Sequence, residues 1–263
     1  VLPWQSAVGR LPSEDAVVLE RGLGGGSGKC LVACPILPRI ANFDDLDPLR
    51  QESGVEVAMI PPGTPIPAEA ALIVLPGSKA TMADLAFLRA EGWDIDILAH
   101  YRRGGMILGI CGGFQMLGRT IADPQGIEGQ PGEMAGLGLL DVTTVLGPAK
   151  ALRTVSGEAM GAGFEGYEMH MGVTTRHSGA PLAILAGDRA DGARDAGARV
   201  LGTYCHGLLA STDLRAQLLA RLGAASDRRD HHAEVDAALD ELAGAMEANL
   251  DIDGLLALTE MGR

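Results

Sequence analysis

The sequence predicts an α/β domain with an open, mostly parallel sheet that is flanked by helices and extended by antiparallel strands. In the first half of the chain, short apolar runs typical of buried strands alternate with helix-compatible stretches. Beyond Gly138 the runs become short and partly alternating, which indicates antiparallel or mixed strands. The chain has 263 residues, 47% of them hydrophobic, enough for one large domain or a domain with appendages.

We divide the chain into three parts. Residues 1–28 are expected to hold the tail of a preceding domain and a glycine-rich linker, residues 29–223 the main domain, and residues 224–263 a helical segment. The glycine-rich stretch lacks the spacing of a phosphate-binding loop, and Cys30 follows its lysine where that loop needs Ser or Thr. In the last part, apolar residues recur with helical spacing, at Val235, Leu239, Leu242 and Met246. We expect an amphipathic helix that packs on the domain or on a part of the protein outside this chain.

The elements of the main domain are expected in the following order. Strands are predicted at 30–37, 55–60, 70–75 and 106–110, and helices at 81–89, 94–103 and 112–119. The segment Asn42-Phe-Asp44-Asp45 is expected to form the N-cap of a helix that begins near Leu46. Shorter strands are predicted at 139–146, 152–156, 164–169 and 182–186. A strand that ends at His206 and a helix at 213–222 complete the domain.

The net charge, the hydropathy pattern and the cysteines indicate which partners and which kinds of site to expect. A net charge of −13 argues against nucleic acid and anionic membranes as partners, because both favour basic surfaces. No apolar run approaches the ~20 residues that span a bilayer, and no signal peptide is visible. The four cysteines form neither a disulfide framework nor part of a Cys/His cluster, so we expect no metal site and a reducing cytoplasm.

Cys111 is the first candidate functional residue. It follows an apolar run and stands between glycines, a pattern that suits a tight turn from a strand into a helix. A cysteine near a helix N-terminus is stabilised as the thiolate, which is the nucleophilic form. The alternative is a buried cysteine packed in a core strand, and Cys111 alone does not separate the two.

His206 favours the catalytic reading. It ends another apolar run, 200–206, and Gly207 follows it. A cysteine nucleophile needs a base that is distant in sequence but adjacent in space. We expect His206 at the carboxyl end of a neighbouring parallel strand, the edge at which catalytic groups gather in open α/β sheets. The alternative is a loop histidine without a role.

Four motifs carry a resemblance to a known family. They are Leu75-Pro-Gly-Ser-Lys79-Ala-Thr81, Gly109-Ile-Cys111-Gly-Gly-Phe-Gln115-Met-Leu-Gly, Tyr167-Glu-Met-His170-Met-Gly172 and Gly202-Thr-Tyr-Cys-His206-Gly. Together they closely resemble the glutaminase half of the cobyric acid synthases, class I glutamine amidotransferases of the cobalamin pathway. The resemblance implies a flavodoxin-like fold and a missing upstream synthetase domain. Since the chain also begins without methionine, we expect it to be a fragment or a processed product.

The resemblance implies a reaction and the residues that perform it. Cys111 would attack the side-chain amide of glutamine, and His206 would move the protons. The oxyanion of the tetrahedral intermediate would be held by the backbone amides of Gly77 and Gly112. Residues expected to bind glutamine are Gln115, Tyr167, Glu168, His170 and Gly172.

Several assignments stay open at this stage. Gln115 fits a solvent-facing helix position almost as well as a glutamine-binding one. Glu168 and His170 are expected on the same face of an extended strand. Many class I amidotransferases place Glu two residues after the histidine, but Leu208 stands there. The group that orients His206 is therefore either Glu168 or absent, which would leave a plain dyad.

The resemblance also implies where the ammonia goes. The synthetase domain would use ATP and magnesium to amidate side-chain carboxylates of a corrinoid, adenosylcobyrinic acid a,c-diamide, and form cobyric acid. This chain itself is expected to need no cofactor. Two alternatives are a related amidotransferase that acts on cobyrinic acid or a cell-wall glutamate, and a catalytically idle docking module.

Overall fold

A computed structural model describes residues 3–11, 30–254 and 257 of the chain. Its centre is a six-stranded sheet with the strand order β13-β14-β6-β4-β1-β3. The strands are β1 (Cys30–Pro35), β3 (Val55–Ile60), β4 (Leu72–Leu75), β6 (Met106–Ile110), β13 (Ala193–Arg194) and β14 (Val200–Thr203). All neighbours pair in parallel except β13, which lies antiparallel at one edge. The expected open, mostly parallel sheet is confirmed.

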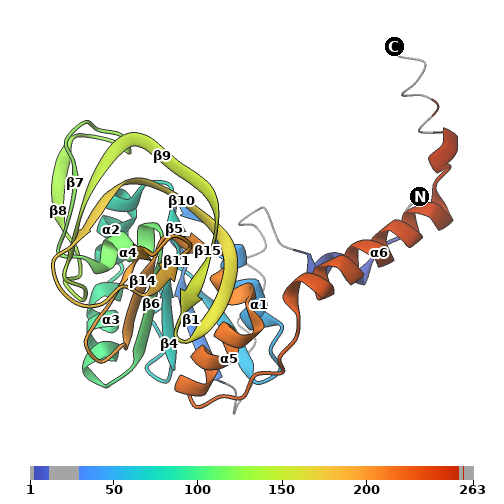
Figure 1. Ribbon diagram of the computed structural model, residues 1–263, viewed down its shortest axis with the longest axis horizontal. Coiled ribbons are helices and arrows are strands. Elements are labelled where there is room, and N and C mark those ends of the chain that lie inside the picture. Colours follow the sequence, from blue (N-terminus) through green and yellow to red (C-terminus); the bar gives the residue numbers. More distant parts are fainter. Residues whose placement is uncertain (1–2, 12–29, 255–256, 258–263) are drawn as a thin grey trace.

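Helices α1 and α5 lie on one face of this sheet and α2, α3 and α4 on the other, whereas α6 extends away from it (Figure 1). The helices with their bounds are η1 (Ser6–Arg10), η3 (Phe43–Leu46), α1 (Asp47–Arg50), α2 (Thr81–Ala90), α3 (Trp93–Arg102), α4 (Gly112–Leu117), η4 (Leu208–Ala210), α5 (Thr212–Arg221) and α6 (His231–Asn249). In β4, Leu72 and Val74 belong to the core on the α1 and α5 side, whereas Ile73 and Leu75 belong to the core with α2, α3 and α4. Because neither face meets water, this run is apolar throughout instead of alternating.

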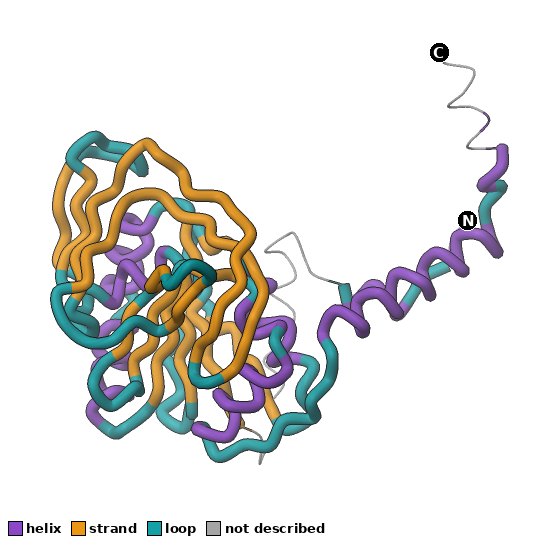
Figure 2. The backbone as a smooth tube through the Cα atoms, in the orientation of Figure 1, coloured by secondary structure: helices purple, strands orange, loops and turns teal. Residues whose placement is uncertain are grey.

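A second sheet forms the predicted antiparallel extension and arches over the domain as a long bent hairpin (Figure 2). Its path is β12-β11-β9-β10-β15, with β7 paired to β9 and β8 paired to β7. The strands are β7 (Thr120–Asp123), β8 (Gly132–Ala135), β9 (Val142–Ala159), β10 (Ala162–Arg176), β11 (Ala183–Leu185), β12 (Arg189–Asp191) and β15 (Cys205–His206). β2 (Ile40–Ala41) and β5 (Gly77–Ser78) form a separate short pair.

Three local predictions were wrong. Residues 142–146 and 152–156 of the two strands expected here belong to the single strand β9, residues 139–141 lie before it, and β7 and β8 were not foreseen. Asn42 makes no side-chain cap, and its Nδ2 instead donates to the Tyr167 hydroxyl at 2.8 Å. The run that ends at His206 is not one strand: β14 ends at Thr203, and the chain then crosses into the second sheet as β15. His206 is therefore not at the end of a parallel strand.

The terminal parts are only partly described. The expected linker falls on residues outside the described ones, and the division at residues 28 and 223 stays a prediction. The expected C-terminal helix is present as α6, whose N-terminus is capped by Asp230. It extends away from the domain beside η1 instead of packing on the sheet (Figure 1). No helix among the described residues is long and apolar enough to cross a membrane.

Gly202 sets how closely α4 packs on β14. A Cβ atom at this position would lie 2.1 Å from Cδ2 of the buried Phe114 ring and 2.9 Å from Leu140 Cδ1. We expect Gly202→Ala to lower the free energy of unfolding by about 1–3 kcal/mol, because the overpacked ring has little room to move. Urea denaturation measures this, with Gly147→Ala as the control because no atom lies within 4 Å of its added Cβ. Equal stability of the two variants would contradict the packing argument.

Candidate active site

Cys111 stands at the turn between β6 and α4, as the glycine pattern predicted. Its backbone has φ 53° and ψ −110°, a conformation that residues other than glycine seldom adopt. The turn is tight because Gly113 passes over β4: a Cβ at Gly113 would lie 2.0 Å from the Leu75 carbonyl oxygen. The Cys111 thiol is half-buried and donates to the Met169 carbonyl on β10 at 3.2 Å. The nucleophile candidate thus lies at the carboxyl edge of the sheet, beneath the second sheet.

His206 is fully buried and held by a carboxylate. Its Nδ1 lies 2.7 Å from Asp45 Oδ2, and the other Asp45 oxygen accepts the Gly207 backbone N–H, also at 2.7 Å. A carboxylate acceptor places the proton on Nδ1, which leaves Nε2 free to exchange a proton with another group. Nε2 is buried and has no hydrogen-bond partner among the described residues. The Tyr167 ring stacks on the imidazole, with the centroids 5.0 Å apart.

The charges around His206 favour its protonated form. Burial by itself lowers the pKa of His206, but the hydrogen bond to Asp45 and the charges of Asp45 and Cys111 outweigh burial and raise the pKa to about 10. The thiol is therefore close enough to His206 to act on its titration. At neutral pH His206 is therefore protonated, with Asp45 balancing the charge on the ring.

Asp45 is the functional candidate that sequence reasoning missed. It lies in η3, where the buried side chains of Phe43 and Leu46 anchor the helix on either side of it. We interpreted this acidic segment as a helix cap, because a cap explains Asn42 and its neighbours locally. The sequence shows an aspartate near the apolar residues Phe43 and Leu46. Its neighbours in the chain do not indicate that it contacts a histidine 161 positions away.

Glu168, the orienting group we considered, does not contact the His206 ring. One of its oxygens accepts from Arg153 at 2.8 Å, and the Arg189 guanidinium and His170 bind the same carboxylate. Burial raises the pKa of Glu168, but these hydrogen bonds and the arginine charges lower it to about 2. Leu208 is buried in η4, so no acidic group stands two residues after the histidine. The acidic group that contacts the His206 ring is Asp45.

The remaining glutamine-binding candidates lie on two faces of β10. Glu168 and His170 share a face, as expected, and are joined at 2.9 Å. The His170 ring stacks on Tyr204, with the centroids 3.8 Å apart. Tyr167 points to the other face, toward His206. Gly172 forms a β-bulge with φ 85°, where a Cβ would lie 2.5 Å from the Val145 carbonyl oxygen. Glutamine binding by these residues stays a prediction.

Gln115 is buried, so the solvent-facing alternative is wrong. Its Nε2 donates to the Met171 carbonyl and to the Tyr204 hydroxyl, each at 3.1 Å. Its Oε1 accepts from the Thr81 hydroxyl at 3.1 Å. Both amide hydrogens are therefore engaged within the protein, where they tie α4 to β10 next to the nucleophile.

The two glycines expected to supply oxyanion donors lie beside the pair. A Cβ at Gly77 would stand 2.8 Å from the Ala41 carbonyl oxygen and 3.7 Å from His206 Cε1. A Cβ at Gly112 would stand 3.0 Å from the Ser78 backbone nitrogen. Glycine permits these close approaches, and the oxyanion role stays a prediction. Within the described part of the chain, no group of three or more His, Cys, Asp or Glu side chains could hold a metal ion.

The chain is similar to a known protein family and to individual proteins of known name. Residues 31–214 match the family model described as a CobB/CobQ-like glutamine amidotransferase domain. The chain is 64% identical over 263 residues to a cobyric acid synthase of Rhizorhabdus wittichii, a match that covers 100% of this chain and 54% of that protein. It is 62% identical over 259 residues to a cobyric acid synthase of Sphingopyxis alaskensis, covering 98% and 53%. The chain thus spans about half the length of the curated relatives it matches.

Among solved structures, PurLQS from Thermotoga maritima has a similar fold. The TM-score is 0.52 at 17% sequence identity, and the alignment covers 81% of this chain and 99% of that one. At this identity the likeness concerns the fold alone. It agrees with the open sheet and flanking helices described above.

Proposed function

The chain belongs to the family of CobB/CobQ-like glutamine amidotransferase domains, and from this premise we propose that it hydrolyses glutamine at Cys111 and His206. One observation carries the proposal. Asp45 holds the His206 ring through Nδ1, and the buried Nε2 is left without a partner while Cys111 acts on its pKa. This arrangement prepares a nucleophile and an acid for cleavage of an amide.

In the first half of the reaction, Cys111 Sγ attacks the side-chain carbonyl carbon of glutamine. The proton of the thiol is already held on His206 Nε2 when the sulfur attacks, so the thiol's hydrogen bond to the Met169 carbonyl is broken at this stage. The carbonyl oxygen becomes an oxyanion, for which we propose the Gly77 and Gly112 amides as donors. As the C–N bond breaks, the imidazolium protonates the nitrogen and ammonia leaves. A glutamyl thioester on Cys111 remains.

In the second half, water cleaves this thioester. Neutral His206 removes a proton from water, and the oxygen adds to the thioester carbon. The C–S bond breaks, and glutamate departs and loses its proton to solvent. The Cys111 sulfur is then free, and the proton taken from water stays on His206. Asp45 stays bonded to Nδ1 and stabilises the positive charge on the ring whenever it forms.

The ammonia is proposed to serve the longer protein. The relatives' name, cobyric acid synthase, supports a corrinoid as the acceptor, with adenosylcobyrinic acid a,c-diamide amidated to cobyric acid. ATP and magnesium would bind in a synthetase part outside this chain, and their chemistry would activate the corrinoid carboxylates. The four free cysteines support a reducing cytoplasmic location.

The acceptor is tested in the longer polypeptide that contains this chain. With glutamine and ATP, we expect amidation of the corrinoid diamide and one glutamate released for each amide formed. A glutamine-derived diazoketone that alkylates Cys111 should stop glutamine-dependent amidation and leave amidation by added ammonium salts. Preference for cobyrinic acid or a cell-wall glutamate, or glutamate release that survives complete alkylation, would contradict the proposal.

A further inference from the structure

Helix α6 is held out from the domain. It is 19 residues long, and only His231 near its start and Ala238 are buried. Figure 1 shows it leaving the domain next to α1 and α5 and extending away from both sheets. A helix this exposed gains little from the domain's own core, so its position must be set at its base.

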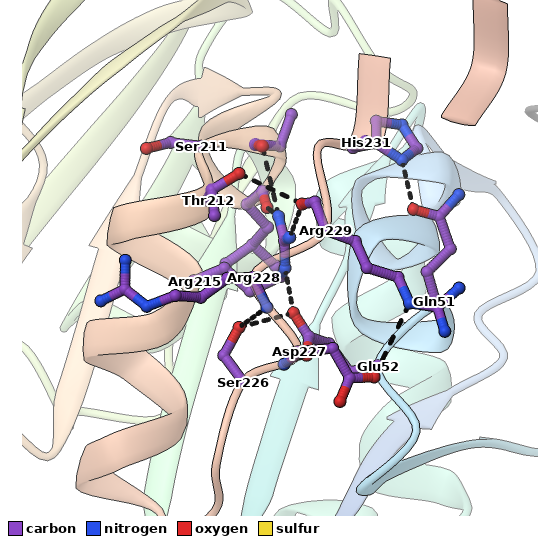
Figure 3. Close-up of polar contacts among 12 residues, drawn as sticks. Gln51, Glu52, Ser211, Thr212, Arg215, Ser226, Asp227, Arg228, Arg229 and His231 are labelled. Atoms are coloured by element: carbon purple, nitrogen blue, oxygen red, sulfur yellow. Dashed lines mark hydrogen bonds and ion pairs between the residues drawn. The ribbon is translucent and has the colours of Figure 1, made fainter. Parts of the chain in front are cut away.

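The base of α6 is fixed by a buried ion pair (Figure 3). Arg215 Nε donates to Glu52 Oε1 at 2.6 Å, and each side chain is 1% exposed. Arg215 also donates to the carbonyls of Leu209 and Arg229, and Arg229 precedes Asp230, the N-cap of α6. A buried pair with all its groups bonded holds one geometry, because breaking it would strand a charge without water.

The segment that leads into α6 is bound by the same carboxylate. Glu52 accepts the Ser226 hydroxyl at 2.8 Å and the Asp227 backbone N–H at 2.5 Å. At the first residue of the helix, His231 Nδ1 lies 3.0 Å from Gln51 Oε1. The direction in which α6 leaves the domain is therefore fixed by the main domain.

One side of α6 is covered by the beginning of the chain. Helix η1 packs against it, so that Ala7 is 2% exposed, and Arg10 pairs with Glu241 at 2.5 Å. We call η1 and α6 together the arm. The arm joins the first described residues of the chain to its last long helix.

A second face of α6 carries an open apolar strip. Leu239 is 48% exposed and Met246 is 37% exposed, with the exposed Ala243 between them. Spacings of four and three residues place these side chains on one side of the helix. α6 carries five acidic residues and no lysine or arginine: Glu234, Asp236, Asp240, Glu241 and Glu247. The strip therefore fits an apolar surface that is bordered by basic residues.

The matches with known proteins indicate what covers the strip. The family model covers residues 31–214, so both parts of the arm lie outside it. The match to the Rhizorhabdus wittichii protein runs through all 263 residues and so includes both parts of the arm. It covers 54% of that protein, so nearly half of that protein lies outside the match. The arm is thus shared with the longer relatives although the amidotransferase domain model does not include it.

We propose that the arm is the docking surface for the synthetase part of the same polypeptide, an inference that rests on the proposed function. Leu239 and Met246 insert into an apolar recess on that part. Asp236, Asp240 and Glu247 meet basic residues around it, since Glu234 and Glu241 already pair with Arg229 and Arg10. The buried pair at the base of the arm sets the angle at which the two parts meet.

Amide hydrogen exchange tests the docking directly. We compare the longer polypeptide with residues 1–263 alone and expect exchange at residues 239–249 to be at least tenfold slower in the longer one. Leu239→Glu combined with Met246→Glu should remove this protection. It should also lower glutamine-dependent amidation at least fivefold relative to ammonium-dependent amidation. Ile95→Glu is the matched control, because Ile95 is 66% exposed on α3, away from the arm.

Two results would overturn the proposal. One is equally fast exchange of α6 in both proteins. The other is protection that rises with protein concentration together with a doubled mass in light scattering, which would assign the strip to a second copy of the chain. Glutamate release by the longer polypeptide is measured in parallel. If it depends on Cys111 while α6 stays unprotected, the docking fails and the proposed function stands.

Discussion

Cys111→Ala should reduce glutamine hydrolysis by roughly ten-thousandfold or more, because without the sulfur no thioester forms and water must attack the amide directly. The rest of the site should persist in this variant. Asp45 still holds His206 through Nδ1, and alanine occupies the turn with the same φ of 53° that cysteine does. We therefore expect the loss in kcat and little change in thermal stability. Glutamate release, measured with a coupled dehydrogenase, gives the rate.

Cys30→Ala is the control for this loss. Cys30 opens β1, is half-buried, and has no contact with the proposed site. The Cys30→Ala protein should retain the wild-type rate of glutamine hydrolysis within a factor of about two, because a small substitution at a half-buried residue away from the site changes the structure little. If the Cys111→Ala protein kept a substantial rate, the nucleophile would have to be another group.

Asp45→Asn should reduce kcat/KM for glutamine by roughly a thousandfold, because an amide can present its donor to Nδ1 and stabilise the wrong tautomer of His206. The pH profile should change as well. His206 must be protonated when ammonia leaves, and its raised pKa of about 10 keeps it so at neutral pH. Removing the carboxylate destabilises the imidazolium, so its pKa falls. The alkaline limb of the kcat/KM profile should therefore move to lower pH.

Asp44→Asn separates this effect from a general loss of negative charge. Asp44 is the neighbour of Asp45 and makes no contact with the His206 ring. Its replacement should leave the pH profile within a few tenths of a unit of the wild type and kcat/KM within about tenfold. A profile that shifts equally in both variants would show that Asp45 acts by charge alone and does not orient the ring.

The fold was largely predictable because the central sheet is buried on both faces. Burial on both faces makes runs such as β4 and β6 apolar throughout, and such runs stand out in the sequence. The second sheet was predicted less well. β9 is one strand of 18 residues with mixed exposure, and its alternation is too irregular to separate a continuous strand from two short ones.

The candidate site was predictable for those residues whose role is indicated by their neighbours in the sequence. Cys111 between glycines and His206 before Gly207 were found from their neighbours in the chain. Asp45 was not found, because its role exists only once η3 reaches β15 in the folded domain. The exit of the chain from the first sheet at Tyr204 was also missed. A run of buried residues looks the same whether it stays in one sheet or crosses into another.

A direct test of the central claim is to look for the glutamyl thioester. The protein is mixed with glutamine, quenched in acid within one turnover, digested and analysed by mass spectrometry. The account predicts a glutamyl group on the peptide that contains Cys111, and no such group when His206 is replaced by alanine. Glutamate release with no adduct on Cys111, or with the adduct on Cys30, Cys34 or Cys205, would contradict it.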